Sequence, residues 1–390
     1  MTISDLNEKL PIVDRHHPAI VTIKERYLLT KPSSTKQTFH VSLDLSSIPL
    51  QFKAGDSIAV YPQNDPLLVE HLIKALKANG DEQITDPRSG SLMSLWDFLS
   101  FKANLARSTS SFLKLFYEYE TSHDKKNSLQ RMLQQDNKPL LTQYLASNDP
   151  LDLFKEYQSV DAPLQEICAQ FGPLLPRFYS VASSQYLYKD EVHLTVALFS
   201  FTHQNEQRYG VGSHFLCHLS ILNKTPIPIY VQPAQHFTLP ADTDIPIIMV
   251  GPGTGVAPFR AFLQERVAKN AKGKNWLFFG ERNRQSDYFY EEEFEMFKSQ
   301  EKVRLDLAFS RDQDTKIYVQ NKMQENAKDL WEWLQDGAYF YVCGDAHRMA
   351  KDVENTLQRI AQTQGGMSEE AAKTYIKSLR TQKRYLADVY

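Results

Sequence analysis

The stretch IPIIMVGPGTGVAP, residues 245–258, decides the fold of the C-terminal part of this chain. It reads as an apolar strand, Ile245–Val250, then a turn with Gly251, Gly253 and Gly255, and then a helix opened by Pro258. Such a turn lets backbone amides and a helix N-terminus approach a pyrophosphate. The spacing differs from the G-x-G-x-x-G fingerprint, so the turn alone is equally compatible with a simple tight connection.

Downstream of this stretch, short apolar runs alternate with helical patterns. The runs are Trp276–Phe279, Arg304–Phe309 and Phe340–Val342, and the expected helices lie near 257–269, 290–299, 321–334 and 349–363. This alternation predicts a doubly wound parallel sheet over residues 241–390. Ligands of such sheets bind beyond the carboxyl ends of the strands. Here the strands lead into Gly280-Glu281-Arg282, Ser310-Arg311-Asp312 and Cys343-Gly344-Asp345.

Four side chains after the third strand favour NADP over NAD. Ser310, Arg311, Lys316 and Tyr318 offer a hydroxyl, a guanidinium, an ammonium and a phenol, which suit a 2′-phosphate. NAD sites usually offer an acidic residue to the 2′-hydroxyl instead. For Arg311 alone a solvated charged loop is the commoner case, and the four residues together reverse that preference. Cys343 is equally compatible with a structural thiol and with a place beside a nicotinamide.

Upstream, alternating patterns predict an antiparallel β-barrel. Strands are expected at 19–30 and 38–45, the pattern continues through 52–61, and it returns at 192–198. Helical spacing dominates between these parts. The predicted organisation is an N-terminal extension (1–17), a barrel formed by 18–65 and 171–240, a helical connecting insertion (66–170) and the sheet domain. The fold class is therefore a multidomain combination of α+β and α/β.

Composition excludes several classes of function. A formal net charge of -3 over 390 residues provides no field for nucleic acid or an anionic membrane, and no apolar run is long enough for a membrane span. The first residues lack a secretory signal, so we expect a cytoplasmic protein. Cys168, Cys217 and Cys343 are widely spaced, and His16, His17, His203 and His347 show no metal spacing, so no metal is expected.

Two segments of the barrel part suit a flavin. Arg177-Phe178-Tyr179-Ser180 offers a cation for a diphosphate, an aromatic plane for an isoalloxazine and a hydroxyl for flavin N5. Gly210-Val211-Gly212-Ser213 precedes an amphipathic segment and forms a second candidate anion cradle. The residues of the first segment could also be ordinary strand residues.

Together these motifs resemble the diflavin reductases, in particular the sulfite reductase flavoproteins of bacteria, from their FAD domain to the C-terminus. The resemblance covers about residues 18–390 and is weaker across the helical insertion. It implies a ferredoxin–NADP reductase-like pair of domains that binds FAD and NADPH. The densest matches are Arg177 to Gln185, Met249 to Phe262, Lys274 to Gly280, Ser310 to Gln320, Tyr341 to Val353 and Arg384 to Tyr390.

Carried over position by position, the resemblance implies specific roles. For FAD it implies Arg177, Phe178, Tyr179, Ser180, Thr195, Val196, Ala197, Gly210, Val211, Gly212 and Ser213. For NADP it implies Thr254, Ser310, Arg311, Lys316, Ile317, Tyr318, Val319, Gln320 and Asp352. Ser180, Cys343 and Asp388 match the hydride-transfer centre. Tyr390 matches an aromatic residue that covers the flavin and must move to admit the nicotinamide, and Phe201 departs from the pattern because it replaces a tyrosine near FAD.

The function implied is hydride transfer from NADPH to FAD, followed by single-electron transfer to a separate acceptor protein in a sulfite reductase-type system. The acceptor is expected in trans because the family's FMN-binding flavodoxin domain has no counterpart in this sequence. It would be a flavodoxin, a ferredoxin or a sirohaem sulfite reductase subunit. One alternative is a ferredoxin/flavodoxin–NADP reductase serving another pathway, and another is a non-catalytic interaction subunit. Five basic residues near the C-terminus form either a docking face or a solvated helix face: Lys373, Lys377, Arg380, Lys383 and Arg384.

Overall fold

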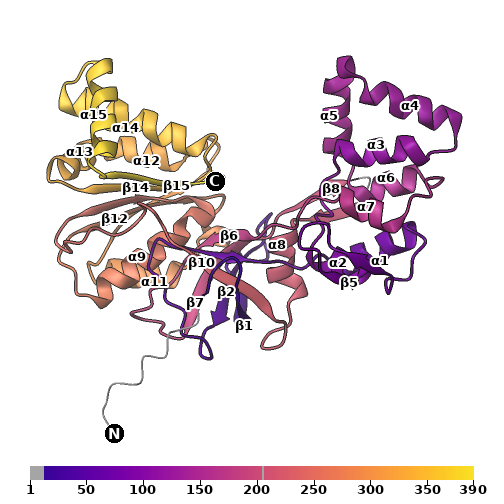
Figure 1. The fold of residues 1–390 in the computed structure, drawn as a ribbon. Helices are drawn as coiled ribbons and strands as arrows, with labels where there is room; N and C mark the ends of the chain where they lie inside the picture. The colour runs from indigo at the N-terminus through magenta and orange to yellow at the C-terminus, as the bar shows by residue number, and fades with distance from the viewer. Residues whose placement is uncertain (1–12, 204–205) are drawn as a thin grey trace, which may run out of the picture. The chain divides into compact units, whose positions relative to one another are not determined.

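The computed structural model describes residues 13–203 and 206–390. The chain forms two compact units (Figure 1). The first comprises the chain up to Val60, Phe178–Leu198 and Ser220–Tyr390, and the second comprises Tyr61–Arg177 and Phe199–Leu219. Of the predicted extension at 1–17, residues 1–12 lie outside the described part of the chain.

The first unit contains a six-stranded sheet in the order β6-β3-β10-β1-β2-β7. An antiparallel bridge between Val181 and Leu194 connects the strands at the two ends of this order, so the sheet closes into a barrel. Alternate residues fill its interior, as Ile23, Val41 and Leu43 show by their complete burial. The strands are β1 (Ala19–Leu28), β2 (Thr38–Asp44), β3 (Ser57–Val60), β6 (Arg177–Ser180), β7 (Glu191–Ala197) and β10 (Ile227–Gln232).

The same unit contains a five-stranded sheet in the order β13-β12-β11-β14-β15, and every neighbouring pair is parallel. This confirms the predicted parallel sheet and its first four strands. The fifth strand, β15, was not expected. The strands are β11 (Ile247–Val250), β12 (Asn275–Glu281), β13 (Arg304–Phe309), β14 (Tyr339–Gly344) and β15 (Tyr385–Val389).

Helices cover both faces of the parallel sheet (Figure 1). Ile247 and Met249 pack toward α9 (Ala257–Ala268) and α11 (Glu291–Ser299), whereas Ile248 and Val250 pack toward the other face. The helix expected at 321–334 is interrupted at Asn326, whose side-chain amide donates to Asp306 Oδ1 at 3.0 Å. Between β12 and α11 lies the short α10 (Arg284–Asp287). The helices on the second face are α12 (Val319–Glu325), α13 (Ala327–Gln335), α14 (Met349–Gly365) and α15 (Glu369–Thr381).

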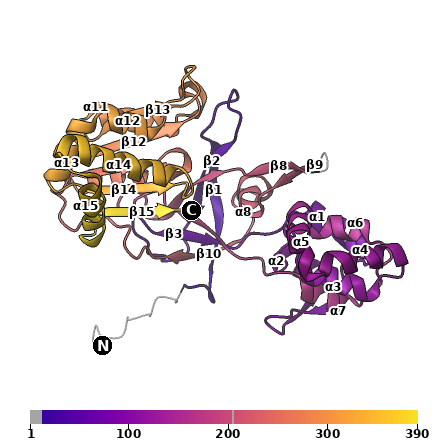
Figure 2. The same ribbon diagram turned by 90° about the horizontal axis from the view of Figure 1, so that it is seen from above.

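The second unit is mainly helical and has its own core (Figure 2). Phe112, Phe116, Phe154 and Phe171 form its centre. Among the described helices of the whole chain, none combines the length and apolar character that a membrane span requires. The elements of the second unit are α1 (Pro66–Ala75), β4 (Gln83–Thr85), β5 (Leu92–Ser94), α2 (Leu95–Phe101), α3 (Ser110–Tyr119), α4 (His123–Leu133), α5 (Lys138–Ser147), α6 (Pro150–Glu156), α7 (Leu164–Gln170), β8 (Ser200–His203), β9 (Glu206–Tyr209) and α8 (Val211–His214).

Phe112→Ala should destabilise the helical unit by about 3–5 kcal/mol, because it removes a fully buried ring that contacts the rings of Phe154 and Phe171. Urea unfolding followed by circular dichroism measures the loss. Leu140→Ala is the control, since that side chain is 52% exposed on α5 and its removal should cost less than about 0.5 kcal/mol. Equal losses in the two variants would contradict the assigned core.

Candidate functional site

The carboxyl ends of β11, β12, β13 and β14 surround a cavity of about 430 Å³. This is the edge at which parallel sheets of this kind bind ligands. The lining combines small residues, hydroxyls, two arginines and three carboxylates: Pro252, Gly253, Gly280, Glu281, Arg282, Ala308, Ser310, Tyr318, Val319, Gln320, Asp345, Arg348, Met349 and Asp352.

The glycine-rich turn after β11 is pressed against the end of β14. A Cβ added to Gly255 would lie 2.1 Å from the Cys343 carbonyl oxygen, so no side chain fits there. Gly253 has a φ of +61°, in the left-handed region that glycine adopts most easily. The turn continues as a 3₁₀ segment, Gly253–Val256, and then as α9. The glycines therefore serve both a close backbone approach and a turn that opens onto the cavity.

The structure brings together five of the residues predicted for NADP. Ser310, Tyr318, Val319, Gln320 and Asp352 line the cavity. The Ser310 hydroxyl donates to the Glu281 carbonyl at 3.3 Å, and Gln320 Nε2 donates to Asp352 Oδ2 at 3.4 Å. The remaining four do not line the cavity: Arg311 and Lys316 are exposed on the loop after β13, Ile317 is half-buried there, and Thr254 lies on the glycine-rich turn.

Several lining residues received no role from the sequence. Arg282 donates through Nη1 to Thr35 Oγ1 at 2.6 Å, and Glu281 forms an ion pair with Lys36, so the loop between β1 and β2 contacts the end of β12. Arg348 lies at the start of α14. The signal for Arg282 was present, since it follows a strand end directly. Arg348 does not directly follow a predicted strand end, and only the fold of the loop after β14 brings it to the cavity.

Asp388 joins two other residues predicted for hydride transfer. Its Oδ2 accepts a hydrogen bond from Ser180 Oγ at 2.9 Å and lies 3.9 Å from Cys343 Sγ. Cys343 pairs directly with Asp388 in the β14–β15 register. Burial, and then the nearby Asp388 charge, raise the pKa of the Cys343 thiol well above its ordinary value, so the thiol stays protonated and can donate. The barrel and the parallel sheet thus each contribute to one polar centre.

Tyr390 lies beside this centre and next to the glycine-rich turn. Its hydroxyl is 2.8 Å from Thr254 Oγ1, and its backbone amide donates to the Gly344 carbonyl at 3.1 Å. The residue is 63% exposed. The backbone is therefore held by the end of β14, and the ring hydroxyl is held by Thr254.

The barrel residues predicted for FAD occupy β6 and β7. The Phe178 ring is 54% exposed and packs edge-on against Tyr230. The Thr195 hydroxyl is used within the protein, because it lies 2.8 Å from the Tyr290 hydroxyl. Thr195, Val196 and Ala197 lie on β7, directly after the Leu194 bridge that closes the barrel, and Ala197 is the exposed one of the three. Tyr179 and Ser180 are both half-buried.

The other predicted FAD residues belong to the second unit. Arg177 Nη1 donates to the Leu175 carbonyl at 2.7 Å. Gly210, Val211, Gly212 and Ser213 form the start of α8, where Ser213 Oγ accepts from Phe199 N at 3.1 Å and donates to the Gly210 carbonyl at 3.1 Å. A Cβ on Gly210 would lie 3.2 Å from Phe199, a tight contact. The Ser213 hydroxyl and the Gly210 amide are therefore both bonded within this unit.

Most of the C-terminal basic residues are engaged within the chain. Lys373 lies 2.8 Å from Glu369, and Arg380 lies 2.8 Å from Glu354. Arg384 donates to the Leu334 and Ala338 carbonyls. These contacts favour a structural role for the three residues over the docking face.

Comparison with known proteins identifies both halves of the chain. Residues 11–215 match the FAD binding domain family, and residues 249–355 match the Oxidoreductase NAD-binding domain. Similar curated proteins are named sulfite reductase (NADPH) flavoprotein alpha-component. The one from Shewanella oneidensis is 40% identical over 366 residues, which cover 93% of this chain and 59% of the relative. The one from Bacillus subtilis is 39% identical over 377 residues, covering 96% and 62%. The chain thus spans about three fifths of the length of the curated relatives that it matches.

Gly255→Ala should lower the melting temperature and abolish measurable binding of a pyrophosphate-containing nucleotide, because the added methyl would collide with the Cys343 carbonyl oxygen. Differential scanning fluorimetry and calorimetry measure the two effects. Gly172→Ala is the control, since its added Cβ would meet Asn104 at 3.9 Å, an ordinary contact. Nucleotide affinity that survives Gly255→Ala would contradict a role for this turn.

Proposed function

This chain belongs to the FAD binding domain family and carries an oxidoreductase NAD-binding domain after it, and on that premise we propose that it is an NADPH-dependent flavoprotein reductase. It would take a hydride from NADPH onto bound FAD and pass electrons singly to a separate acceptor protein. The observation that carries the proposal is the polar centre at Asp388. There a hydroxyl from the barrel and a thiol from the nucleotide-binding sheet lie within 2.9 and 3.9 Å of one carboxylate oxygen.

The nucleotide half of the site fits NADPH. Ser310 and Tyr318 present hydroxyls at the cavity, and Arg311 and Lys316 lie exposed on the adjoining loop, within the segment that leads from β13 to α12. Cationic and hydroxyl groups of this kind bind a phosphate through charge-assisted hydrogen bonds. Arg282 and Arg348 also lie in the cavity wall, beside the carboxylates of Glu281, Asp345 and Asp352, and their guanidinium groups would contact the remaining phosphates.

The flavin half fits FAD in its donor groups. In the first unit, Tyr179 would support the ring system and the backbone of Thr195 to Ala197 would line it. In the second unit, Arg177 and the Gly210–Ser213 turn offer groups for a diphosphate. When bound, FAD supplies the conversion of a two-electron hydride donor into a one-electron donor. Ser180 and Cys343 would hold protons next to the reacting atoms, and Asp388 would orient both groups while favouring the positive charge that develops on the nicotinamide.

Tyr390 would control access to this centre. Its backbone is bonded to Gly344 and its hydroxyl to Thr254, so the ring would rotate away by breaking the Thr254 contact, without displacing β15. An aromatic ring that stacks on the flavin must leave before the nicotinamide can take its place, and such a step lowers nicotinamide affinity.

The proposed acceptor follows from the relatives, whose names describe flavoprotein components of NADPH–sulfite reductase. We place the chain in a sulfite reductase-type system in the cytoplasm, with a sirohaem subunit, a flavodoxin or a ferredoxin as the acceptor. A ferredoxin/flavodoxin–NADP reductase of another pathway is the second candidate, because the same donor half would serve it. Retention of the Ser180, Cys343 and Asp388 centre speaks against a non-catalytic interaction subunit.

Absorbance spectroscopy tests the proposed function directly. The purified chain should be yellow with bound FAD, and anaerobic NADPH should bleach the flavin band. Ser180→Ala should retain FAD but slow the bleaching about 10- to 100-fold, because it removes the hydroxyl that meets Asp388. A colourless protein that takes up no FAD would refute the reductase.

Cofactor preference tests the phosphate site. Arg311→Gln combined with Lys316→Gln should reduce the preference for NADPH over NADH by on the order of a hundredfold, since each charge-assisted contact contributes about 1.5–3 kcal/mol. Steady-state kinetics with the two nucleotides measure the ratio. Lys328→Gln is the matched control, because that side chain is 80% exposed on α13 and should leave the preference unchanged. An unaltered preference in the double variant would place the 2′-phosphate elsewhere.

A further inference from the structure

Arg260 and Gln264 are polar side chains buried in the middle of the first unit. They lie one turn apart on α9, and only 5% and 1% of their surfaces are exposed. One side of α9 packs on the parallel sheet through Phe259 and Phe262. The two polar side chains instead reach the barrel. A buried guanidinium requires several hydrogen bonds to offset its desolvation, so its partners show what it holds in place.

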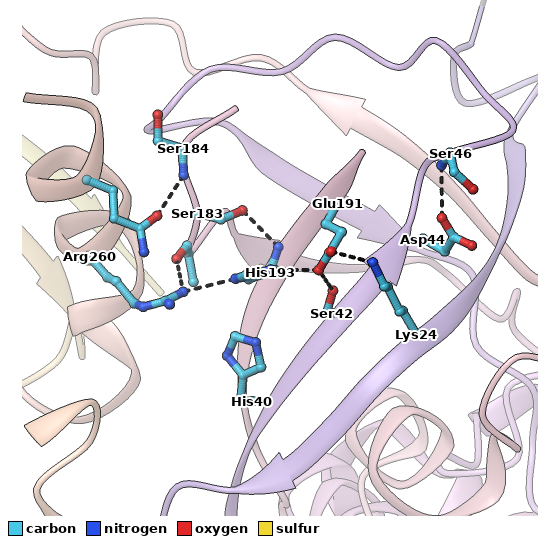
Figure 3. Close-up of polar contacts among 12 residues, drawn as sticks. Lys24, His40, Ser42, Asp44, Ser46, Ser183, Ser184, Glu191, His193 and Arg260 are labelled. Atoms are coloured by element: carbon cyan, nitrogen blue, oxygen red, sulfur yellow. Dashed lines mark hydrogen bonds and ion pairs between the residues drawn. The ribbon is translucent and has the colours of Figure 1, made fainter. Parts of the chain in front are cut away.

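Both side chains bond to the backbone segment that follows β6 (Figure 3). Arg260 Nη1 donates to the Ala182 carbonyl at 2.7 Å, and Gln264 Oε1 accepts from the Ser184 amide at 3.0 Å. Glu293 of α11 fixes both of them, because its two oxygens accept from Arg260 Nε at 2.5 Å and from Gln264 Nε2 at 2.6 Å. Two side chains of α9 therefore bind the backbone of two alternate residues, Ala182 and Ser184, in one segment of the barrel.

His193 of β7 completes the contact and fixes its own tautomer. Arg260 Nη1 lies 3.1 Å from His193 Nδ1, and a guanidinium has no acceptor, so Nδ1 must offer a lone pair. The proton then resides on Nε2, which lies 3.1 Å from Glu191 Oε2. Burial, and then the charge of Arg260, lower the pKa of His193 to about 4, which agrees with a neutral ring. Lys24 and Ser42 hold Glu191 from β1 and β2.

Tyr290 forms a second connection between the nucleotide-binding part and the barrel. The guanidinium carbon of Arg260 lies 4.5 Å from its ring centroid, and its hydroxyl is 2.8 Å from Thr195 Oγ1 and 3.2 Å from His40 Nδ1. Tyr290 also has a φ of +56°, an unfavourable conformation for a residue with a Cβ. Its contacts with the barrel compensate for this conformation, so the contact between α9, α11 and the barrel is a specific one.

The segment that α9 binds directly follows Ser180, the last residue of β6. Ala182 follows two residues later, and the Ser180 hydroxyl meets Asp388 of the nucleotide-binding half. The same α9 begins directly after the glycine-rich turn, whose Thr254 contacts Tyr390. One helix thus connects the nucleotide turn at its N-terminus with the barrel segment at its centre.

We propose that Arg260 is a positioning residue for hydride transfer, which holds the segment after β6 so that Ser180 meets Asp388 at the reacting centre. This inference rests on the proposed reductase function. It predicts a specific defect: the nucleotide still binds, but it is misplaced relative to the flavin. Small misplacements of reacting groups can slow a reaction by as much as a hundredfold.

The test compares two buried arginines of α9. Arg260→Met removes the bonds to the barrel segment. Arg266→Met is the matched control, because Arg266 is 3% exposed on the same helix but donates to the Thr243, Ile245 and Gly273 carbonyls on the sheet side. Gln264→Met is a milder variant that loses the Ser184 contact without removing a charge. Arg260→Lys restores the charge but not the planar fork that serves several acceptors.

Three measurements are made on each full-length variant. Stopped-flow absorbance gives the rate of flavin reduction by NADPH, calorimetry gives the affinity for 2′,5′-ADP, and hydrogen–deuterium exchange reports on peptides that cover residues 181–188. For Arg260→Met we expect reduction slowed about 10- to 100-fold, 2′,5′-ADP affinity within about twofold of wild type, and faster exchange in these peptides. Gln264→Met should show a smaller effect of the same kind, and Arg260→Lys a partial rescue. Arg266→Met should leave exchange at 181–188 unchanged.

The outcomes separate the two proposals. Equal reduction rates in the wild type and Arg260→Met would overturn the positioning role, and so would equal slowing in Arg260→Met and Arg266→Met. If Arg260→Met does not fold, Gln264→Met decides by the same criteria. If the wild type binds no FAD, the reductase function fails, and the exchange comparison alone decides whether Arg260 anchors this segment.

Discussion

The register of β15 on β14 is the constraint on which the candidate site depends. It sets Asp388 opposite Cys343, and the same pairing brings the Tyr390 amide to the Gly344 carbonyl. A shift by one residue would move the Asp388 side chain to the other face of the sheet, away from Ser180. The pairing is parallel, so it requires a long crossover, which α14 and α15 provide. The chemistry proposed at Asp388 thus depends on the two helices of this crossover.

Much of the fold could be predicted because its signals are local. The apolar run Ile247–Val250 is a fully buried strand, and Arg304–Phe309 is a strand that is buried at its carboxyl end. The glycines after Val250 mark a turn whose tightness the Cys343 carbonyl explains. β15 could not be predicted in this way. The run Tyr385–Val389 is short and includes Asp388, so its strand character depends on pairing with β14 rather than on its composition. The break at Asn326 likewise depends on a tertiary partner, Asp306.

The site was predictable to the extent that each residue follows a strand end. This rule located Ser310 and Cys343. Arg282 also follows a strand end and lines the cavity, but no pattern in the sequence was a reason to assign it a role. Arg260 illustrates the limit. In the sequence it is one charged residue within a helical pattern, and only the contact with Ala182 and His193 of the barrel and with Glu293 of α11 makes it a buried group with three polar contacts. Resemblance supplied roles for Ser180 and Asp388 that local patterns alone could not have joined.

The order of strands in the barrel has a consequence for biosynthesis. β3 and β6 are neighbours in the sheet, although the residues between them, Tyr61 to Pro176, belong to the helical unit. β1 and β3 both pair with β10, which is made later still. During synthesis, the first three strands therefore have unpaired edges until β10 is made, and such edges promote aggregation and chaperone binding. Early folding of the helical unit around Phe112 would shorten the effective loop that the barrel has to close, so the unit that carries none of the proposed hydride-transfer residues would govern the yield of folded protein.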